Sequence, residues 1–193
     1  MIVLLNGTSS SGKTTLAKAL QRALAEPYLR LGIDTVVFAL PGRWLEAPRW
    51  HEVFVYRGAD PELEITAGPL GDKLVTALHR MVAAAAAVGW GVLVDHVLLD
   101  RRWVADAAAV LGGYQLLSVG VRCPLAEVVR RERERRDRTL GQARAQFDVV
   151  HTHARYDVEV DTSAADPDAC AAQIISAMRG HGGRSVLAAP SAG

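Results

Sequence analysis

The chain opens with the stretch Ile2-Val3-Leu4-Leu5-Asn6-Gly7-Thr8-Ser9-Ser10-Ser11-Gly12-Lys13-Thr14-Thr15-Leu16. An apolar run typical of a buried strand leads into the spacing Gly-x-x-x-x-Gly-Lys-Thr, and an amphipathic helical pattern follows. Chance seldom places this spacing between a strand and a helix, so the context favours a phosphate-binding P-loop. The alternative is a plain turn in which Ser10 or Ser11 caps the helix.

The residue types of this loop suit an anion. Gly7 and Gly12 are expected to adopt backbone angles that a side chain would forbid, which lets N–H groups turn inward around a phosphate. The helix that begins at the second glycine adds the positive end of its dipole. Lys13 should reach the β- and γ-phosphates of ATP, and the Thr14 hydroxyl should ligate Mg²⁺. The predicted nucleotide contacts in the loop are Gly7, Thr8, Ser9, Ser10, Ser11, Gly12, Lys13, Thr14 and Thr15.

Length and composition indicate one globular domain. The chain has 193 residues, half of them apolar, and a net charge of +1, which disfavours nucleic acid or a membrane surface as a partner. Its cysteines, Cys123 and Cys170, lie far apart and suggest a reducing compartment without zinc. No apolar run is long enough to span a bilayer, and a core strand begins at once, so we expect no cleaved signal and a cytoplasmic location.

Strand and helix patterns alternate along the chain. Strands are expected near residues 2–6, 28–34, 91–95, 114–121 and 156–162, and helices near residues 12–25, 70–88, 99–111, 125–138, 142–154 and 166–179. This alternation predicts an α/β fold with a five-stranded parallel sheet and helices on both faces. We expect a single domain over residues 1–180 and a flexible tail over residues 181–193.

Two predicted strands end in an acid, where open parallel sheets carry functional groups. The stretch Tyr28 to Thr35 contains Asp34, which the spacing alone assigns equally well to the active site or to the cap of a helix starting near Thr35. The buried run that starts at Gly91 ends at Asp95, which matches the aspartate that orients Mg²⁺ in nucleotide sites. His96 follows it and is a candidate for substrate binding, although a lone histidine is more often a structural residue.

Residues 41–69 interrupt the alternation. Prolines and glycines punctuate this segment, which also carries the aromatic side chains Trp44, Trp50, Phe54 and Tyr56. A long irregular insertion of this kind is usually functional, so we expect it to form the wall or lid of the acceptor site, with Trp44, Trp50 and Phe54 in contact with substrate. The alternative is a small satellite core in which the aromatic rings pack on one another.

The segment from Arg130 to Arg138 alternates arginine with acids. It could be a solvated helix with opposite charges four residues apart, as in the pairs Glu127–Arg131, Glu132–Arg136 and Glu134–Arg138. It could also supply arginines to a transferring phosphate, whose charge suits guanidinium forks. We favour Arg135 and Arg138 for that role, because they lie near the turn at Gly141.

With these stretches in view, the chain resembles the chloramphenicol phosphotransferases, a family of P-loop small-molecule kinases. The stretches that carry the resemblance span residues 2 to about 179. They are Leu5–Thr15, Glu26–Leu29 with Gly32-Ile33-Asp34-Thr35, Gly120-Val121-Arg122-Cys123, Val149-Val150-His151 with Tyr156-Asp157-Val158-Glu159-Val160-Asp161-Thr162, and the arginine run Arg131–Arg138.

The resemblance implies a three-layer P-loop kinase fold and transfer of the ATP γ-phosphate to a hydroxyl of a small molecule. The acceptor would be an antibiotic, chloramphenicol or another hydroxylated natural product, modified for resistance or self-protection. The resemblance also implies that Asp34 is the general base and that residues 130–142 form an arginine lid, with Arg135 and Arg138 catalytic and Arg131 on the nucleotide. The loop after Thr162 would border the adenine.

The chain departs from the family pattern between Gly42 and Gly68, and His96 stands where the family tends to have a second acid. These departures leave the acceptor open. A metabolic or nucleic-acid 5′-hydroxyl kinase and a non-catalytic nucleotide-binding module are the alternative functions. Self-association of the chain is left open.

Overall fold

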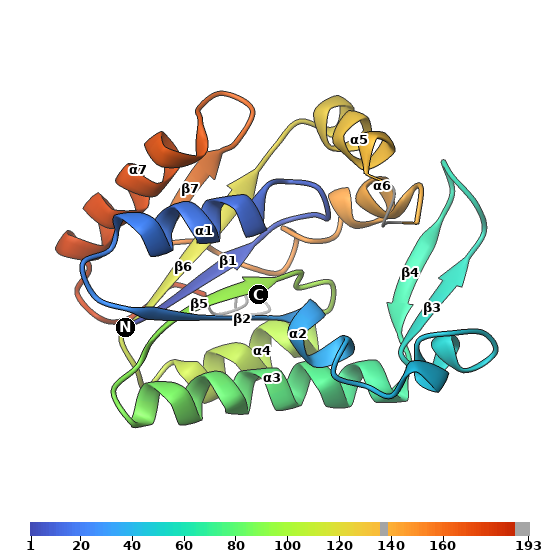
Figure 1. The fold of residues 1–193 in the computed structure, drawn as a ribbon, viewed down its shortest axis with the longest axis horizontal. Coiled ribbons are helices and arrows are strands. Elements are labelled where there is room, and N and C mark those ends of the chain that lie inside the picture. Colours follow the sequence, from blue (N-terminus) through green and yellow to red (C-terminus); the bar gives the residue numbers. More distant parts are fainter. Residues whose placement is uncertain (136–138, 188–193) are drawn as a thin grey trace, which may run out of the picture.

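A five-stranded parallel sheet forms the centre of the molecule, with the strand order β2-β5-β1-β6-β7 (Figure 1). This computed structural model describes residues 1–135 and 139–187. The strands are β1 (Ile2–Asn6), β2 (Tyr28–Gly32), β5 (Gly91–His96), β6 (Leu116–Arg122) and β7 (Val158–Asp161). Asn6 lies opposite both His96 and Gly120, and Gly32 lies opposite Asp95. The carboxyl ends of β1, β2, β5 and β6 therefore meet at one edge of the sheet.

Helices cover both faces of this sheet, as Figure 1 shows. One face packs against α1 (Lys13–Ala23) and α7 (Pro167–Gly180), and the other against α3 (Pro69–Ala87) and α4 (Arg101–Leu111). The three central strands, β1, β5 and β6, are mainly apolar because each buries residues under both helix layers. The predicted three-layer α/β fold is confirmed.

The remaining elements lie beyond the carboxyl edge of the sheet, on the same side as the P-loop. They are α2 (Ile33–Val37), the short 3₁₀ helices η1 (Gly42–Trp44) and η2 (Arg49–Glu52), the strands β3 (Phe54–Arg57) and β4 (Glu64–Ala67), α5 (Leu125–Glu134) and α6 (Gln142–Phe147). β3 and β4 form an antiparallel hairpin that the sequence patterns did not predict.

Close backbone packing fixes this hairpin to α3. The Gly68 N–H donates to the Val53 carbonyl at 2.9 Å, and a Cβ on Gly71 would lie only 2.1 Å from that same oxygen. Gly68 and Gly71 are thus required by a close approach of two backbones, since a Cβ on Gly68 would also lie 2.3 Å from the Glu52 carbonyl oxygen.

The helix predicted over residues 142–154 ends at Phe147 instead. The Val150 carbonyl accepts a hydrogen bond from Asn6 Nδ2 at 2.7 Å, and Asp157 N donates to the Ser118 carbonyl at 2.9 Å. These contacts draw residues 148–157 along the end of the sheet, so the helical pattern does not continue.

The first part of the predicted flexible tail packs against the domain. His181 Nε2 contacts the Leu116 carbonyl at 2.7 Å, the Ser185 hydroxyl donates to Asp157 at 2.6 Å, and Leu187 is buried in the core beneath α3 and α4. These contacts place residues 181–187 against the domain, while residues 188–193 lie outside the described residues, and the flexibility of the tail stays a prediction. Within the described residues, no helix combines the length and apolar character needed to cross a membrane.

Replacement of Asp157 by Asn tests this anchoring of the tail. The pKa of the Asp157 carboxyl is lowered overall. Burial alone would raise this pKa, but hydrogen bonds from Ser185, Ser118 and Val186 to the carboxylate outweigh the effect of burial. The carboxylate then contributes stability that is present above the usual pKa and is lost as pH falls through the lowered one. We expect Asp157→Asn to reduce the free energy of unfolding by about 1–3 kcal/mol at neutral pH, measured by urea denaturation.

The difference between wild type and Asp157→Asn should shrink as pH falls below the ordinary range of an aspartate. Glu159→Gln is the matched control, because Glu159 lies on the same strand in an exposed ion pair with Arg122 and should cost less than about 1 kcal/mol. If the difference in unfolding free energy between wild type and Asp157→Asn does not vary with pH, the charge of the Asp157 carboxylate is not the source of the stabilisation.

Candidate active site

The P-loop joins the end of β1 to the start of α1. Gly12 has a φ of 89°, in the left-handed region that favours glycine, as expected. Gly7 does not have such an angle. A Cβ there would lie 2.6 Å from the Val121 carbonyl oxygen, so Gly7 is required by the close approach of β6. Ser10, with a φ of 62°, takes the left-handed angle instead.

The loop serines do not cap α1. Gly12 occupies the cap position without a side-chain hydrogen bond, and the buried hydroxyls of Ser10 and Ser11 have no hydrogen-bond partner in the described part of the chain. Buried hydroxyls without partners cost free energy, so their presence in the loop at the start of α1 fits a site that binds an anion.

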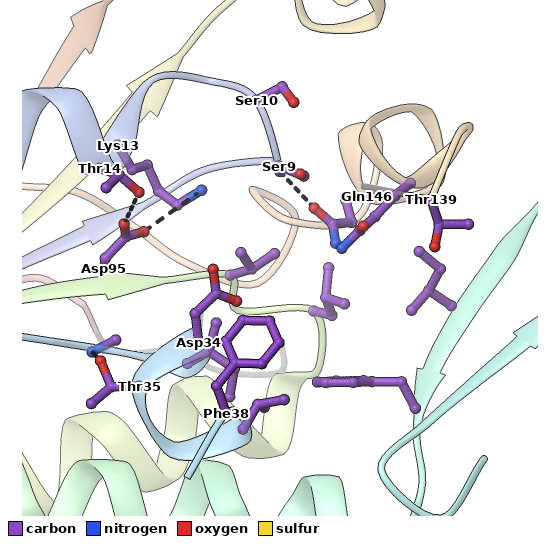
Figure 2. A pocket seen from close by; sticks show the side chains of 18 of the residues that line it. Ser9, Ser10, Lys13, Thr14, Asp34, Thr35, Phe38, Asp95, Thr139 and Gln146 are labelled. Atoms are coloured by element: carbon purple, nitrogen blue, oxygen red, sulfur yellow. Dashed lines mark hydrogen bonds and ion pairs between the residues drawn. The ribbon is translucent and has the colours of Figure 1, made fainter. Parts of the chain in front are cut away.

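Lys13, Thr14 and Asp95 lie together at the inner end of the loop (Figure 2). The Thr14 hydroxyl donates to Asp95 Oδ2 at 2.6 Å, Lys13 Nζ lies 3.9 Å from Asp95 Oδ1, and Lys13 also donates to the Thr8 carbonyl at 2.7 Å. A hydroxyl and a carboxylate are the hard oxygen ligands that Mg²⁺ prefers. Among residues 1–135 and 139–187, no group of three or more His, Cys, Asp or Glu side chains could hold a metal ion, so the predicted Mg²⁺ site would rely on few protein ligands.

Asp34 lies in the first turn of α2, and it is not the cap of that helix. Gly32 occupies the cap position, and its N–H donates to the Thr35 hydroxyl at 3.2 Å. Since β2 and β5 are neighbours and Gly32 lies opposite Asp95, their ends carry Asp34 and Asp95 into one cavity. Figure 2 shows the Asp34 carboxylate turned into the space beside Lys13 and Asp95.

That cavity has a volume of about 920 Å³, within the range of a small-molecule site. It is lined by the predicted residues Ser9, Ser10, Gly12, Lys13, Thr14, Thr15, Asp34, Trp50, Phe54, Asp95 and Arg135. The predicted residues Gly7, Thr8, Ser11, Trp44, His96 and Arg131 are not part of its lining.

Three aromatic residues of the insertion, Trp50, Phe54 and Tyr56, pack on one another and also line the cavity, whereas their contact with substrate stays a prediction. The ring of Trp50 lies 5.6 Å from that of Phe54 and 6.3 Å from that of Tyr56, so these rings pack on one another. All three also line the cavity, together with Leu45 and Ile65. Trp44 instead packs against the Arg49 guanidinium, whose Cζ lies 4.5 Å from the ring centroid.

His96 is a fully buried structural residue, and the prediction that it binds substrate is wrong. Its Nδ1 accepts from Val97 N at 2.8 Å, and its Nε2 lies 3.0 Å from Nε2 of His79, which in turn contacts Asp106. Burial and the neighbouring His79 hold the pKa of His96 well below its usual value, so the ring is neutral. None of the His96 side chain reaches the cavity.

The arginine run divides into different environments. Arg130 lies on the solvated face of α5 between Glu127 and Glu134. Arg131 pairs with Glu127 at 2.7 Å, as the spacing predicts, and also reaches the Thr162 carbonyl at 3.0 Å. This places its guanidinium beside Gly12, at the start of α1. Arg135 follows α5 and lines the cavity, whereas Arg138 lies outside the described residues.

Two polar residues whose contacts the sequence patterns did not predict hold α6 against the site. The buried Glu132 carboxylate accepts from the N–H groups of Gly141 and Ala143, at 2.8 and 2.7 Å, and so caps α6. Gln146 Oε1 accepts from Ser9 N at 2.6 Å. The charge spacing assigned Glu132 to a pair with Arg136, and nothing in the sequence distinguishes Gln146 from a surface glutamine.

The P-loop lies between β1 and α1 at the carboxyl ends of the parallel strands, and an acid lies at the ends of both β2 and β5. This arrangement defines a nucleotide-binding phosphotransferase of the P-loop kinase class. The chain belongs to the chloramphenicol phosphotransferase-like family, whose model matches residues 1–179. A Mycobacterium tuberculosis protein named "Putative O-phosphotransferase" is 36% identical over 169 residues, which cover 84% of this chain and 75% of that protein.

Solved kinases share the fold. The Mycobacterium tuberculosis APS kinase, in a structure with AMPPNP and APS, has a TM-score of 0.64 at 18% identity, covering 92% of this chain and 96% of that one. A sugar kinase from Janibacter has a TM-score of 0.65 at 13% identity, covering 92% and 94%. The fold and the family together make this chain a phosphotransferase enzyme.

A substitution at Gly7 tests whether close packing of β6 shapes the P-loop. We expect Gly7→Ala to lower the free energy of unfolding by about 1–3 kcal/mol and to weaken nucleotide binding, because the new Cβ would meet the backbone of Val121. Gly113→Ala is the control, since a Cβ there meets nothing within 4 Å. Denaturation and calorimetric titration with ADP measure the two effects, and equal behaviour of both variants would contradict this role of Gly7.

Proposed function

We propose that this enzyme transfers the γ-phosphate of ATP to a hydroxyl of a small molecule. The acceptor would be an antibiotic, chloramphenicol or another hydroxylated natural product, and the reaction would serve resistance or self-protection in the cytoplasm. The observation that carries the proposal is one cavity of about 920 Å³ that contains Lys13, Thr14 and Asp95 together with Asp34 and an aromatic wall. Both substrates of a transfer reaction would then meet in one space.

The donor half of the cavity supports ATP as the donor. The P-loop N–H groups and Lys13 would hold the phosphates, and Arg131 would lie beside the nucleotide near Gly12 and Thr162. Thr14 and Asp95 would hold Mg²⁺, which when bound neutralises part of the charge on the β- and γ-phosphates. The Thr14–Asp95 hydrogen bond of 2.6 Å keeps these two oxygen groups together in the free protein.

The position of Asp34 supports its role as general base. As the acceptor oxygen forms its bond to the γ-phosphorus, the bond between that phosphorus and the leaving oxygen of ADP breaks, and the hydroxyl proton passes to the Asp34 carboxylate. Arg135, also in the cavity lining, would neutralise charge on the transferred group, and Arg138 is proposed to assist it.

The acceptor half is lined mainly by apolar and aromatic side chains, including Phe38, Trp50, Phe54 and Tyr56. Such a surface suits a neutral compound with an apolar body and a reactive hydroxyl. We propose that residues 1–180 act as one catalytic domain in which residues 41–69 bind the acceptor and residues 130–142 contribute the arginines.

The direct test is to measure ADP release with Mg-ATP across a panel of hydroxylated antibiotics that includes chloramphenicol, with product mass read in parallel. We expect a gain of one phosphate on at least one compound. Phosphorylation of a metabolite or of a nucleic-acid 5′-hydroxyl in a second panel, but of no antibiotic, would reassign the acceptor. ATP binding without transfer to any alcohol would contradict the proposed function.

Asp34→Asn tests the base. The amide keeps the size of the side chain but cannot take the proton, so kcat should fall by about 10²–10⁴-fold. The affinities for ADP and AMPPNP should stay within about twofold of wild type, as calorimetric titration will measure. Asp168→Asn, on the exposed start of α7, is the control. Transfer at the wild-type rate by Asp34→Asn would remove this residue from the mechanism.

Trp50→Ala tests the aromatic wall. Loss of the indole surface should raise KM for the acceptor about tenfold or more, while KM for ATP changes little. Trp90→Ala is the control, because Trp90 is partly exposed and is not part of the cavity lining. Steady-state kinetics with each substrate varied in turn separate the two constants, and an equal rise in both would argue against an acceptor-specific contact.

A further inference from the structure

Gln146 projects from α6 toward the P-loop, and its amide orientation is fixed by its partner. Ser9 N lies 2.6 Å from Oε1 of this side chain. A backbone N–H only donates, so the atom that faces it must be the amide oxygen. The Nε2 group, with its two hydrogens, must therefore point away from Ser9.

Among residues 1–135 and 139–187, the hydrogen bond of the Gln146 side chain is made by Oε1, and Nε2 has no acceptor. The side chain is only 3% exposed, yet it lines the cavity. In Figure 2, Gln146 stands across the cavity from Asp95, with its oxygen on Ser9. A buried amide that keeps two hydrogens directed into a cavity beside an anion-binding loop is a donor awaiting an acceptor.

Contacts along the first half of α6 hold this donor in place. The Glu132 carboxylate caps the helix through Gly141 and Ala143. Asp60, at the turn of the β3–β4 hairpin, accepts from Arg144 Nε at 3.1 Å. The position of Gln146 is thus set by the protein before any ligand binds, as an efficient transition-state donor requires.

We propose that Gln146 is a further catalytic residue whose Nε2 group donates a hydrogen bond to an oxygen of the γ-phosphoryl group of ATP. This inference rests on the proposed function. The acceptor hydroxyl is a poor alternative partner, because a donor to its oxygen would withdraw the electron pair that attacks phosphorus. A phosphoryl oxygen, which carries charge throughout the transfer, gains from a neutral donor in a buried site.

Binding of ADP and AMPPNP to Gln146→Met separates this role from a structural one without the need for turnover. The methionine side chain has a similar length and volume but no amide. We expect affinity for Mg-AMPPNP, which has a γ-phosphate group, to fall about tenfold or more, while affinity for Mg-ADP stays within about twofold. Gln173→Met on the exposed face of α7 is the control and should change neither affinity.

Gln146→Glu is the second variant, because its carboxylate still accepts from Ser9 N but has no hydrogen to donate. It should also lose the preference for AMPPNP over ADP. Equal losses of both affinities in Gln146→Met, or a full AMPPNP preference in Gln146→Glu, would show that Gln146 acts only through Ser9 and would overturn the proposal. Failure of the proposed function appears separately, as absence of phosphate transfer by the wild-type protein.

Discussion

The hydrogen bonds of one buried amide, that of Asn6 at the end of β1, hold the site together. Its Oδ1 accepts from Leu98 N at 2.8 Å, and its Nδ2 donates to the Val150 carbonyl and the Tyr156 hydroxyl, each at 2.7 Å. The residue before the P-loop is thereby tied to the segment after β5 and to the segment between α6 and β7. A fully satisfied buried amide favours one arrangement of these segments over others, because any shift leaves a polar group without a partner.

Two further sets of contacts position the side chains of the cavity. On one side, the register of β2 and β5 brings Asp34 and Asp95 together, although they lie far apart in sequence. On the other side, α6 connects the P-loop, the arginine helix α5 and the β3–β4 hairpin through Gln146, Glu132 and Arg144. Since α6 has only a few residues and cannot be stable alone, these side-chain contacts determine its position.

Local sequence patterns predicted those features that local chemistry controls. The P-loop, the alternation of strands and helices and the placement of Asp34 and Asp95 at strand ends follow from spacing and periodicity. The β3–β4 hairpin did not follow, because its register depends on backbone contacts with Val53 and α3. The burial of His96 did not follow either, since its partner His79 comes from α3 and is itself held by Asp106 of α4. Roles set by distant partners leave no signal in a residue's own neighbourhood.

The family model matches residues 1–179, but residues after 179 also belong to the hydrophobic core of this protein. Ser185 donates to Asp157, and Leu187 is buried in the core cluster that includes α3 and α4. A chain cut after residue 179 would therefore lose part of the packed core that lies against α3 and α4.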